Sequence, residues 1–152
     1  MSTKENLEAA FAGESQANRK YLAFAKKAEQ DGKPQVARLF RAAAHAETVH
    51  AHAHLRVLGG VKTTAENLEA AIAGEGHEFK TMYPGFIKEA EAEGHKQALV
   101  TFRNANTVEE IHYNLYGKAL EAVKAGKDLP AAEVWVCEVC GNEVESGKAQ
   151  CP

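Results

Sequence analysis

The pattern Glu-x-x-His occurs twice in the chain, at Glu47–His50 and at Glu109–His112. Residues three apart lie on one face of a helix, so the carboxylate and the imidazole of each copy point the same way. A glutamate in a repeated Ala-Gly-Glu triplet precedes each copy, at Glu14 and at Glu75. Carboxylate and imidazole ligands together suit iron or manganese better than metals that prefer thiolates. These residues therefore predict a metal site.

The chain contains an internal duplication, which makes this prediction specific. Residues 6–14 recur as residues 67–75, with eight of nine positions identical at an offset of 61. Further along, the two Glu-x-x-His patterns match at an offset of 62, as do Gly32 and Gly94. Two copies of one helical hairpin can pack about a pseudo-twofold axis. We therefore expect a nearly symmetric centre, broken only where Glu78 matches Ala17.

The predicted ligands match the set found in ferritin-like di-iron carboxylate proteins, in which two helices each give a Glu and two others each give a Glu-x-x-His. They are Glu14, Glu47, His50, Glu75, Glu109 and His112, with Glu78 as a seventh. A lone Glu-x-x-His is weak, because it is often a pair of surface charges. Here both copies have apolar neighbours such as Ala44 and Ile72, and buried carboxylates are costly unless they are paired or bind metal.

The elements that must carry these residues are four long helices. Apolar residues at spacings of three and four predict helices over about 3–30, 34–58, 64–93 and 96–124, with Thr63 or Thr64 as the cap of the third. Pro84 should kink or reshape the third helix. Short turns indicate an all-α fold, an antiparallel four-helix bundle. The link between the second and third helices is either a tight turn or an extended crossover.

The last part of the chain has a different composition. We expect the bundle over residues 1–126, a linker over 127–133 and a small β/loop metal module over 134–152. Its cysteines are Cys137, Cys140 and Cys151, and clustered cysteines in a reducing compartment are more often metal ligands than disulfides. A structural zinc knuckle is the alternative to an iron site here.

The whole chain resembles the rubrerythrin family. The resemblance rests on residues 12–18, on both Glu-x-x-His patterns, on Gly74-Glu75-x-x-Glu78 followed by Met82-Tyr83-Pro84, and on the cysteine tail. It implies a two-iron peroxidase in which Glu78 is a ligand of the oxidised centre and His50 replaces it on one iron after reduction. It also implies that Tyr21 and Tyr83 hydrogen-bond around the site.

The resemblance extends to a rubredoxin-like tail. The family pattern implies a third iron on four cysteines, which passes electrons to the two-iron centre, often across a head-to-tail homodimer. This sequence ends one residue after Cys151, before the expected fourth cysteine, so we expect a truncated tail and poor turnover with a physiological reductant.

Composition narrows the partners. The formal net charge of −3 gives no reason to expect nucleic acid or an anionic membrane as a partner. The polar N-terminus has no apolar stretch behind it, so we expect no signal peptide, no membrane span and a cytoplasmic location. Hydrogen peroxide and an electron-donating reductase or rubredoxin are the expected partners.

The leading functional hypothesis is a non-haem di-iron peroxidase that reduces hydrogen peroxide to water in oxidative-stress defence. A ferritin-like ferroxidase that binds iron is the alternative, and a purely structural metal is the third. The cysteine tail and Glu78 favour the peroxidase. The sequence leaves open the metal, the reductant, the oligomeric state and any exchange of hairpins between subunits.

Overall fold

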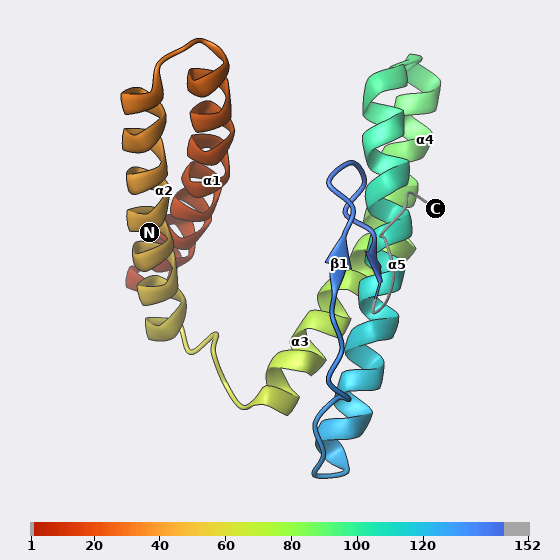
Figure 1. Cartoon of the computed structure of the whole chain (residues 1–152). Coiled ribbons are helices and arrows are strands. Elements are labelled where there is room, and N and C mark those ends of the chain that lie inside the picture. The colour runs from red at the N-terminus through yellow and green to blue at the C-terminus, as the bar shows by residue number, and fades with distance from the viewer. Residues whose placement is uncertain (1, 145–152) are drawn as a thin grey trace. The chain divides into compact units, whose positions relative to one another are not determined.

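The computed structural model describes residues 2–144 of the chain, and most of them are helical (Figure 1). The helices are α1 (Thr3–Gln30), α2 (Pro34–Val57), α3 (Thr64–His77), the π-helical segment η1 (Glu78–Met82), α4 (Tyr83–Glu93) and α5 (Lys96–Lys124). The all-α prediction is confirmed, and the helix bounds lie close to those expected. The expected third helix is the continuous series α3–η1–α4.

Matching caps begin the two halves. Ser2 before α1 and Thr63 before α3 each accept a hydrogen bond from the backbone of the third helical residue, and a glutamate there, Glu5 or Glu66, returns the bond. Such capping boxes satisfy N–H groups that the helix leaves unpaired. Of the two threonines considered from the sequence, Thr63 is the cap.

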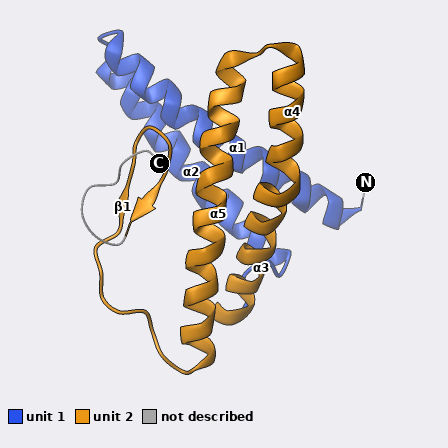
Figure 2. Ribbon diagram, turned by 90° about the vertical axis from the view of Figure 1, so that its right-hand side faces the viewer, with its two compact units in different colours: residues 1–62 blue, residues 63–152 orange. Residues whose placement is uncertain are grey.

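The structure divides into two compact units, residues 1–62 and residues 63–152 (Figure 2). In the first unit, α1 packs against α2. In the second unit, α3, η1 and α4 pack against α5, and the small β-hairpin contacts α5 as well. Each unit is therefore a helical hairpin with its own internal packing.

Alanines form the seam between α1 and α2. Ala25 and Ala37 are fully buried, and Ala28 lies beside them with Phe40 packed against the group. Asn18 is also buried, and its amide donates hydrogen bonds to the carbonyl of Ala44 at 2.6 Å and to the hydroxyl of Thr48 at 2.8 Å. Small side chains allow the two helix backbones to approach closely, and the Asn18 contacts fix their register.

The duplication is visible in the packing of both hairpins. The aromatic cluster of the first hairpin and that of the second occupy matching positions, and the closest phenylalanine centroids are 5.6 Å apart in each. The members are Tyr21, Phe24 and Phe40 in one and Tyr83, Phe86 and Phe102 in the other. Likewise, Glu29 pairs with Arg41 as Glu91 pairs with Arg103. All these residues match at an offset of 62.

The π-helical segment explains why the repeat offset changes. Matches up to Glu75 follow an offset of 61, and matches from Tyr83 onward follow 62, so the second copy has one additional residue between them. The segment η1 occupies Glu78–Met82, within this interval. A π-turn spans one residue more than an α-turn, so it absorbs the extra residue and the faces on either side keep their alignment. The predicted reshaping near Pro84 is thereby confirmed.

The last described residues form a small β-hairpin. Strand β1 (Trp135–Val136) pairs antiparallel with β2 (Glu143–Val144), with Trp135 opposite Val144. The turn between them carries Cys137 and Cys140 and is closed by two backbone hydrogen bonds, from Cys137 to Asn142 and from Gly141 to Cys137. We call residues 135–144 the knuckle. Within residues 2–144, no helix is both long and apolar enough to cross a membrane.

Candidate metal centre

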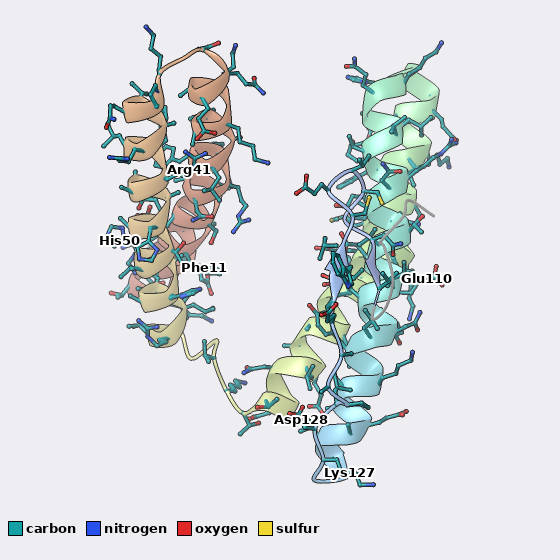
Figure 3. All side chains as sticks on the ribbon, viewed as in Figure 1. Phe11, Arg41, His50, Glu110, Lys127 and Asp128 are labelled. Atoms are coloured by element: carbon teal, nitrogen blue, oxygen red, sulfur yellow. The ribbon has the colours of Figure 1, made fainter. Side chains whose placement is uncertain are left out.

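The first hairpin brings three of the predicted ligands together. Glu14 on α1 and Glu47 and His50 on α2 offer ligand atoms that all lie within 4.8 Å of one another. The Nδ1 atom of His50 lies 2.9 Å from Oε2 of Glu47, as expected for residues three apart on one helix face. His50 is labelled on α2 in Figure 3, and its side chain is 56% exposed.

The second hairpin repeats this arrangement. Glu75 on α3 and Glu109 and His112 on α5 also place their ligand atoms within 4.8 Å of one another. Nδ1 of His112 lies 2.9 Å from Oε2 of Glu109 and 3.5 Å from Oε1 of Glu75. The side chain of His112 is only 20% exposed. Each unit thus carries one triad of two carboxylates and one imidazole.

The second triad holds two carboxylates that raise the cost of ionising one another. Burial raises the pKa of the Glu75 carboxyl above its ordinary value, and hydrogen bonding and charge from Glu109 raise it further, while His112 opposes them. Two carboxylates this close resist ionising together unless a cation compensates them. Oxygen and imidazole donors converging from two helices are a ligand set that fits a divalent metal ion such as iron.

Glu78, the asymmetric seventh candidate, lies at the start of the π-helical segment and is half-buried. Its carboxylate is not among the ligand atoms that converge within 4.8 Å. It does lie close enough to Tyr83 for its charge to act there. Burial raises the pKa of the Tyr83 hydroxyl, and the charges of Glu109, Glu78 and Glu75 raise it further.

The two predicted tyrosines lie in the two matching aromatic clusters. Tyr83 packs against Phe86 and Phe102 and feels the carboxylates of the second triad. Tyr21 occupies the matching place in the first hairpin, with its ring 6.1 Å from that of Phe40.

Sequence reasoning missed Tyr116 and Glu143. The ring of Tyr116 lies 6.2 Å from that of His112, and burial, with the charges of Glu75, Glu143 and Glu109, raises its pKa. Its spacing of four residues after His112 would have indicated this proximity. Glu143 lies 3.7 Å from His112, measured from Oε1 to Nε2, across a gap of 31 residues that no local pattern bridges.

The cysteine site is only partly described. Cys137 and Cys140 are half-buried in the knuckle, and the third predicted ligand, Cys151, lies outside the described residues. The knuckle turn holds Cys137 and Cys140 on one short loop, which is compatible with binding one ion.

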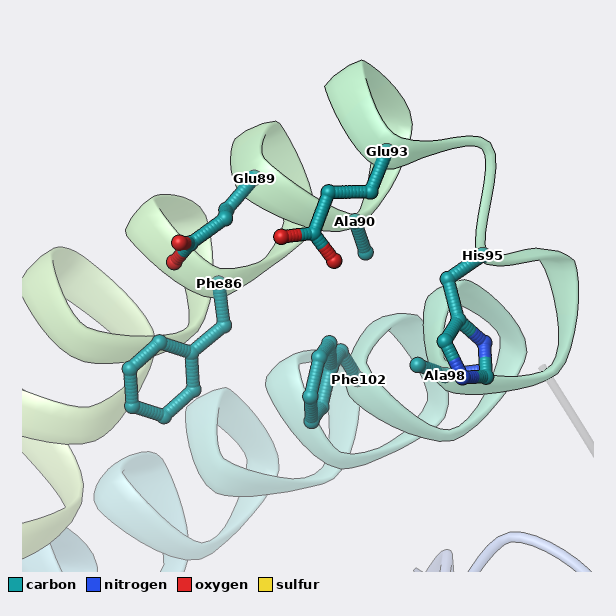
Figure 4. Close-up of a pocket in the computed structure, with 7 residues that line it drawn as sticks. All are labelled: Phe86, Glu89, Ala90, Glu93, His95, Ala98 and Phe102. Atoms are coloured by element: carbon teal, nitrogen blue, oxygen red, sulfur yellow. The ribbon is translucent and has the colours of Figure 1, made fainter.

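An open pocket lies between α4 and α5, near their connecting turn (Figure 4). Its lining combines Phe86 and Phe102 with Glu89, Glu93 and His95. None of the predicted ligands lines it, and its three titratable groups are not among the clusters whose ligand atoms converge. Among the described residues, the converging carboxylate and imidazole atoms lie in the two triads and not in this pocket.

Comparison with known proteins agrees with the geometry. The sequence model of the rubrerythrin family matches residues 5–120. The chain is 35% identical to rubrerythrin-2 of Clostridium acetobutylicum, over 99% of this chain and 90% of that protein. It is 37% identical to a rubrerythrin of Porphyromonas gingivalis, over 99% and 84%.

A solved structure of nigerythrin is also similar to this chain. The fully reduced, all-ferrous state of nigerythrin aligns with a TM-score of 0.55 and 32% identity, over 99% of this chain and 80% of that one. Nigerythrin of Nitratidesulfovibrio vulgaris is also similar in sequence, with 36% identity over 92% of this chain and 75% of that protein. With a family match over the helical region and relatives along nearly its whole length, this chain belongs to the rubrerythrin family.

Proposed function

We propose that this protein is a di-iron peroxidase that reduces hydrogen peroxide to two molecules of water. The observation that carries the proposal is the pair of matching triads, each with two carboxylates and one imidazole within 4.8 Å. Membership of the rubrerythrin family supports a di-iron protein of oxidative-stress defence. The peroxidase activity itself goes beyond that family assignment.

Iron is the metal that we propose for this centre. The ligands are Glu14, Glu47, His50, Glu75, Glu109 and His112, with Glu78 as a seventh. A carboxylate and imidazole set suits iron or manganese, and the structural relative nigerythrin was solved in an all-ferrous state. Two ferrous ions would supply the two electrons and the Lewis acidity that cleavage of an O–O bond requires.

We propose that side chains of the centre provide proton transfer. Reducing one peroxide to two waters consumes two electrons and two protons. We assign proton transfer to Glu78, because this half-buried carboxylate is an additional acid on one side of an otherwise symmetric ligand set. We assign to Tyr83 a hydrogen bond toward these carboxylates, because their charges, together with burial, raise the pKa of its hydroxyl. Tyr21 takes the place of Tyr83 in the first hairpin, where His50 is a proposed metal ligand.

We further propose that the electrons arrive through the cysteine module. With a complete set of cysteine ligands, Cys137, Cys140 and Cys151 would help to hold one iron that carries single electrons. An external reductase or rubredoxin would reduce that iron, and we propose a homodimer as the assembly. The proposed organisation is a helical domain over 1–126, a linker over 127–133 and the module over 134–152, in a cytoplasmic protein.

Stopped-flow oxidation of the anaerobic, Fe(II)-loaded protein tests the proposal. We expect fast oxidation by hydrogen peroxide, with about one peroxide consumed per two ferrous ions, and much slower oxidation by oxygen. Faster oxidation by oxygen, or assembly into a many-subunit shell, would support the ferritin-like ferroxidase instead. If the fully loaded protein shows no redox activity, the remaining hypothesis is that the metal is purely structural.

A further inference from the structure

Glu143 in the knuckle faces a predicted metal ligand on α5. Its Oε1 atom lies 3.7 Å from Nε2 of His112, within ion-pair distance. The two residues belong to the same compact unit. The side chain of Glu143 is 34% exposed and that of His112 is 20% exposed, so the contact is partly shielded from water.

The imidazole of His112 presents its two nitrogens to different partners. Nδ1 faces the triad, 2.9 Å from Glu109 and 3.5 Å from Glu75. Nε2 faces Glu143 on the other edge of the ring. A histidine that binds metal through one nitrogen usually donates its other N–H to a carboxylate, carbonyl or water, and this partner fixes the ring and its tautomer.

The duplication supplies an internal comparison. His50 matches His112 and has the same 2.9 Å contact from Nδ1 to the glutamate three residues earlier. Among the described residues, however, no ion pair involves Nε2 of His50. The two histidines therefore differ on the outer edge of the ring, where the knuckle contributes Glu143.

The knuckle is held against α5 by packing as well as by charge. Val139, Cys140, Gly141 and Glu143 line one hollow together with residues of α5, including Val108 and His112. Val108 on α5 is buried, and a Cβ atom placed on Gly141 would lie 3.8 Å from Cγ1 of Val108. The hairpin register places Glu143 opposite Val136. Glu143 is thus presented by a folded element that contacts α5 at more than one point.

We propose that Glu143 is a positioning residue for His112, and that it couples docking of the knuckle to metal binding by the second triad. The carboxylate lies at ion-pair distance from the Nε2–H edge of the ring and keeps Nδ1 directed at Glu75 and Glu109. The inference rests on the proposed metal site, but not on the reaction that takes place there. Docking of the knuckle and occupation of the triad then stabilise each other, because such coupling is reciprocal.

Metal affinity of the full chain tests the first half of the proposal. Glu143→Ala and Glu143→Gln should each weaken Co(II) binding by about tenfold, the lower end of the range for partners of this kind. When either Glu143 variant is loaded with Zn(II), the NMR resonance of Nε2 of His112 should shift relative to the parent protein, while that of His50 stays unchanged. Glu138→Gln is the matched control, because Glu138 lies exposed on the same knuckle and carries the same charge.

Hydrogen exchange tests the second half. His112→Ala should speed exchange of the backbone amides of residues 137 and 141, which close the knuckle turn, whereas His50→Ala should not. The proposal is overturned if Glu143→Ala binds Co(II) as Glu138→Gln does, or if both histidine variants leave knuckle exchange unchanged. Affinity and exchange are independent of peroxide turnover, so failure of the peroxidase proposal would be seen separately.

Discussion

Deleting Thr81 should convert the second hairpin into a closer copy of the first. Thr81 is exposed and lies in η1, where the second copy has its additional residue. Without that residue the segment can form a regular α-helix, as the matching part of α1 does. Pro84 would then stand inside a continuous α-helix instead of in the first turn after a π-segment. We expect a cost of about 3 kcal/mol, because the ring clashes with the preceding turn and removes a hydrogen bond.

The first hairpin supplies the rescue. Leu22 matches Pro84 in the repeat, so adding Pro84→Leu to the deletion should recover most of the lost stability, to within about 1 kcal/mol of the parent. Pro84→Leu alone should have little effect, since the proline already sits where a helix tolerates it. Urea unfolding of the metal-free proteins, followed by far-ultraviolet circular dichroism, gives these differences.

Deleting Lys20 is the matched control. Lys20 lies in the matching part of α1 and is also exposed, but α1 contains no π-turn that could absorb the loss. The deletion would rotate one part of α1 by about 100° against the other. Either Asn18 loses its two buried hydrogen bonds or Tyr21 leaves its cluster, at about 2–4 kcal/mol. If the rescued Thr81 deletion is no more stable than the Thr81 deletion alone, our account of the extra residue is refuted.

Three further predictions address the site. Glu78→Ala should slow peroxide reduction by about 100-fold or more while both triads still bind metal, as expected when a proton-transfer group is removed; full peroxide activity in stopped flow would exclude this role. In the metal-free protein, the pKa of Glu75 is higher in the folded state than in the unfolded state. Its protonated form therefore stabilises the fold below about pH 4, and this contribution is lost as the pH rises through the raised pKa. Glu75→Gln should therefore gain stability relative to the parent between about pH 4 and pH 7, and a pH-independent difference in urea unfolding would contradict the shift. Gly141→Ala should cost the knuckle about 1–2 kcal/mol because Gly141 has a φ of +84°, seen as faster amide exchange at residue 137 with exchange in α1 unchanged.

The sequence predicted the helices because their signals are local. Apolar spacing, the glycine and proline turns and the capping residues all act within a few positions, and the helix bounds followed them closely. The triads were also predictable, since each Glu-x-x-His is one turn of a helix. The glutamate from the neighbouring helix could be assigned to the same triad only because the duplication repeated it.

The features that the sequence did not predict depend on contacts between distant residues. The offset change from 61 to 62 was visible, yet only the structure places a π-helical segment there. The approach of Glu143 to His112 depends on where the knuckle docks, and no periodic pattern encodes that position. Asn18 was overlooked for the same reason, because its partners lie 26 and 30 residues away on α2.

The π-helical segment also records the history of the chain. A single insertion or deletion in one copy, after the ancestral hairpin gene was duplicated, accounts for the whole change of register. The aromatic cluster and the ion pair beyond it are present in both copies, so the event was tolerated in a segment that includes the exposed Thr81. Two identical hairpins of the first type would therefore form a fully symmetric protein, with both triads but without the lone carboxylate of Glu78 on one side.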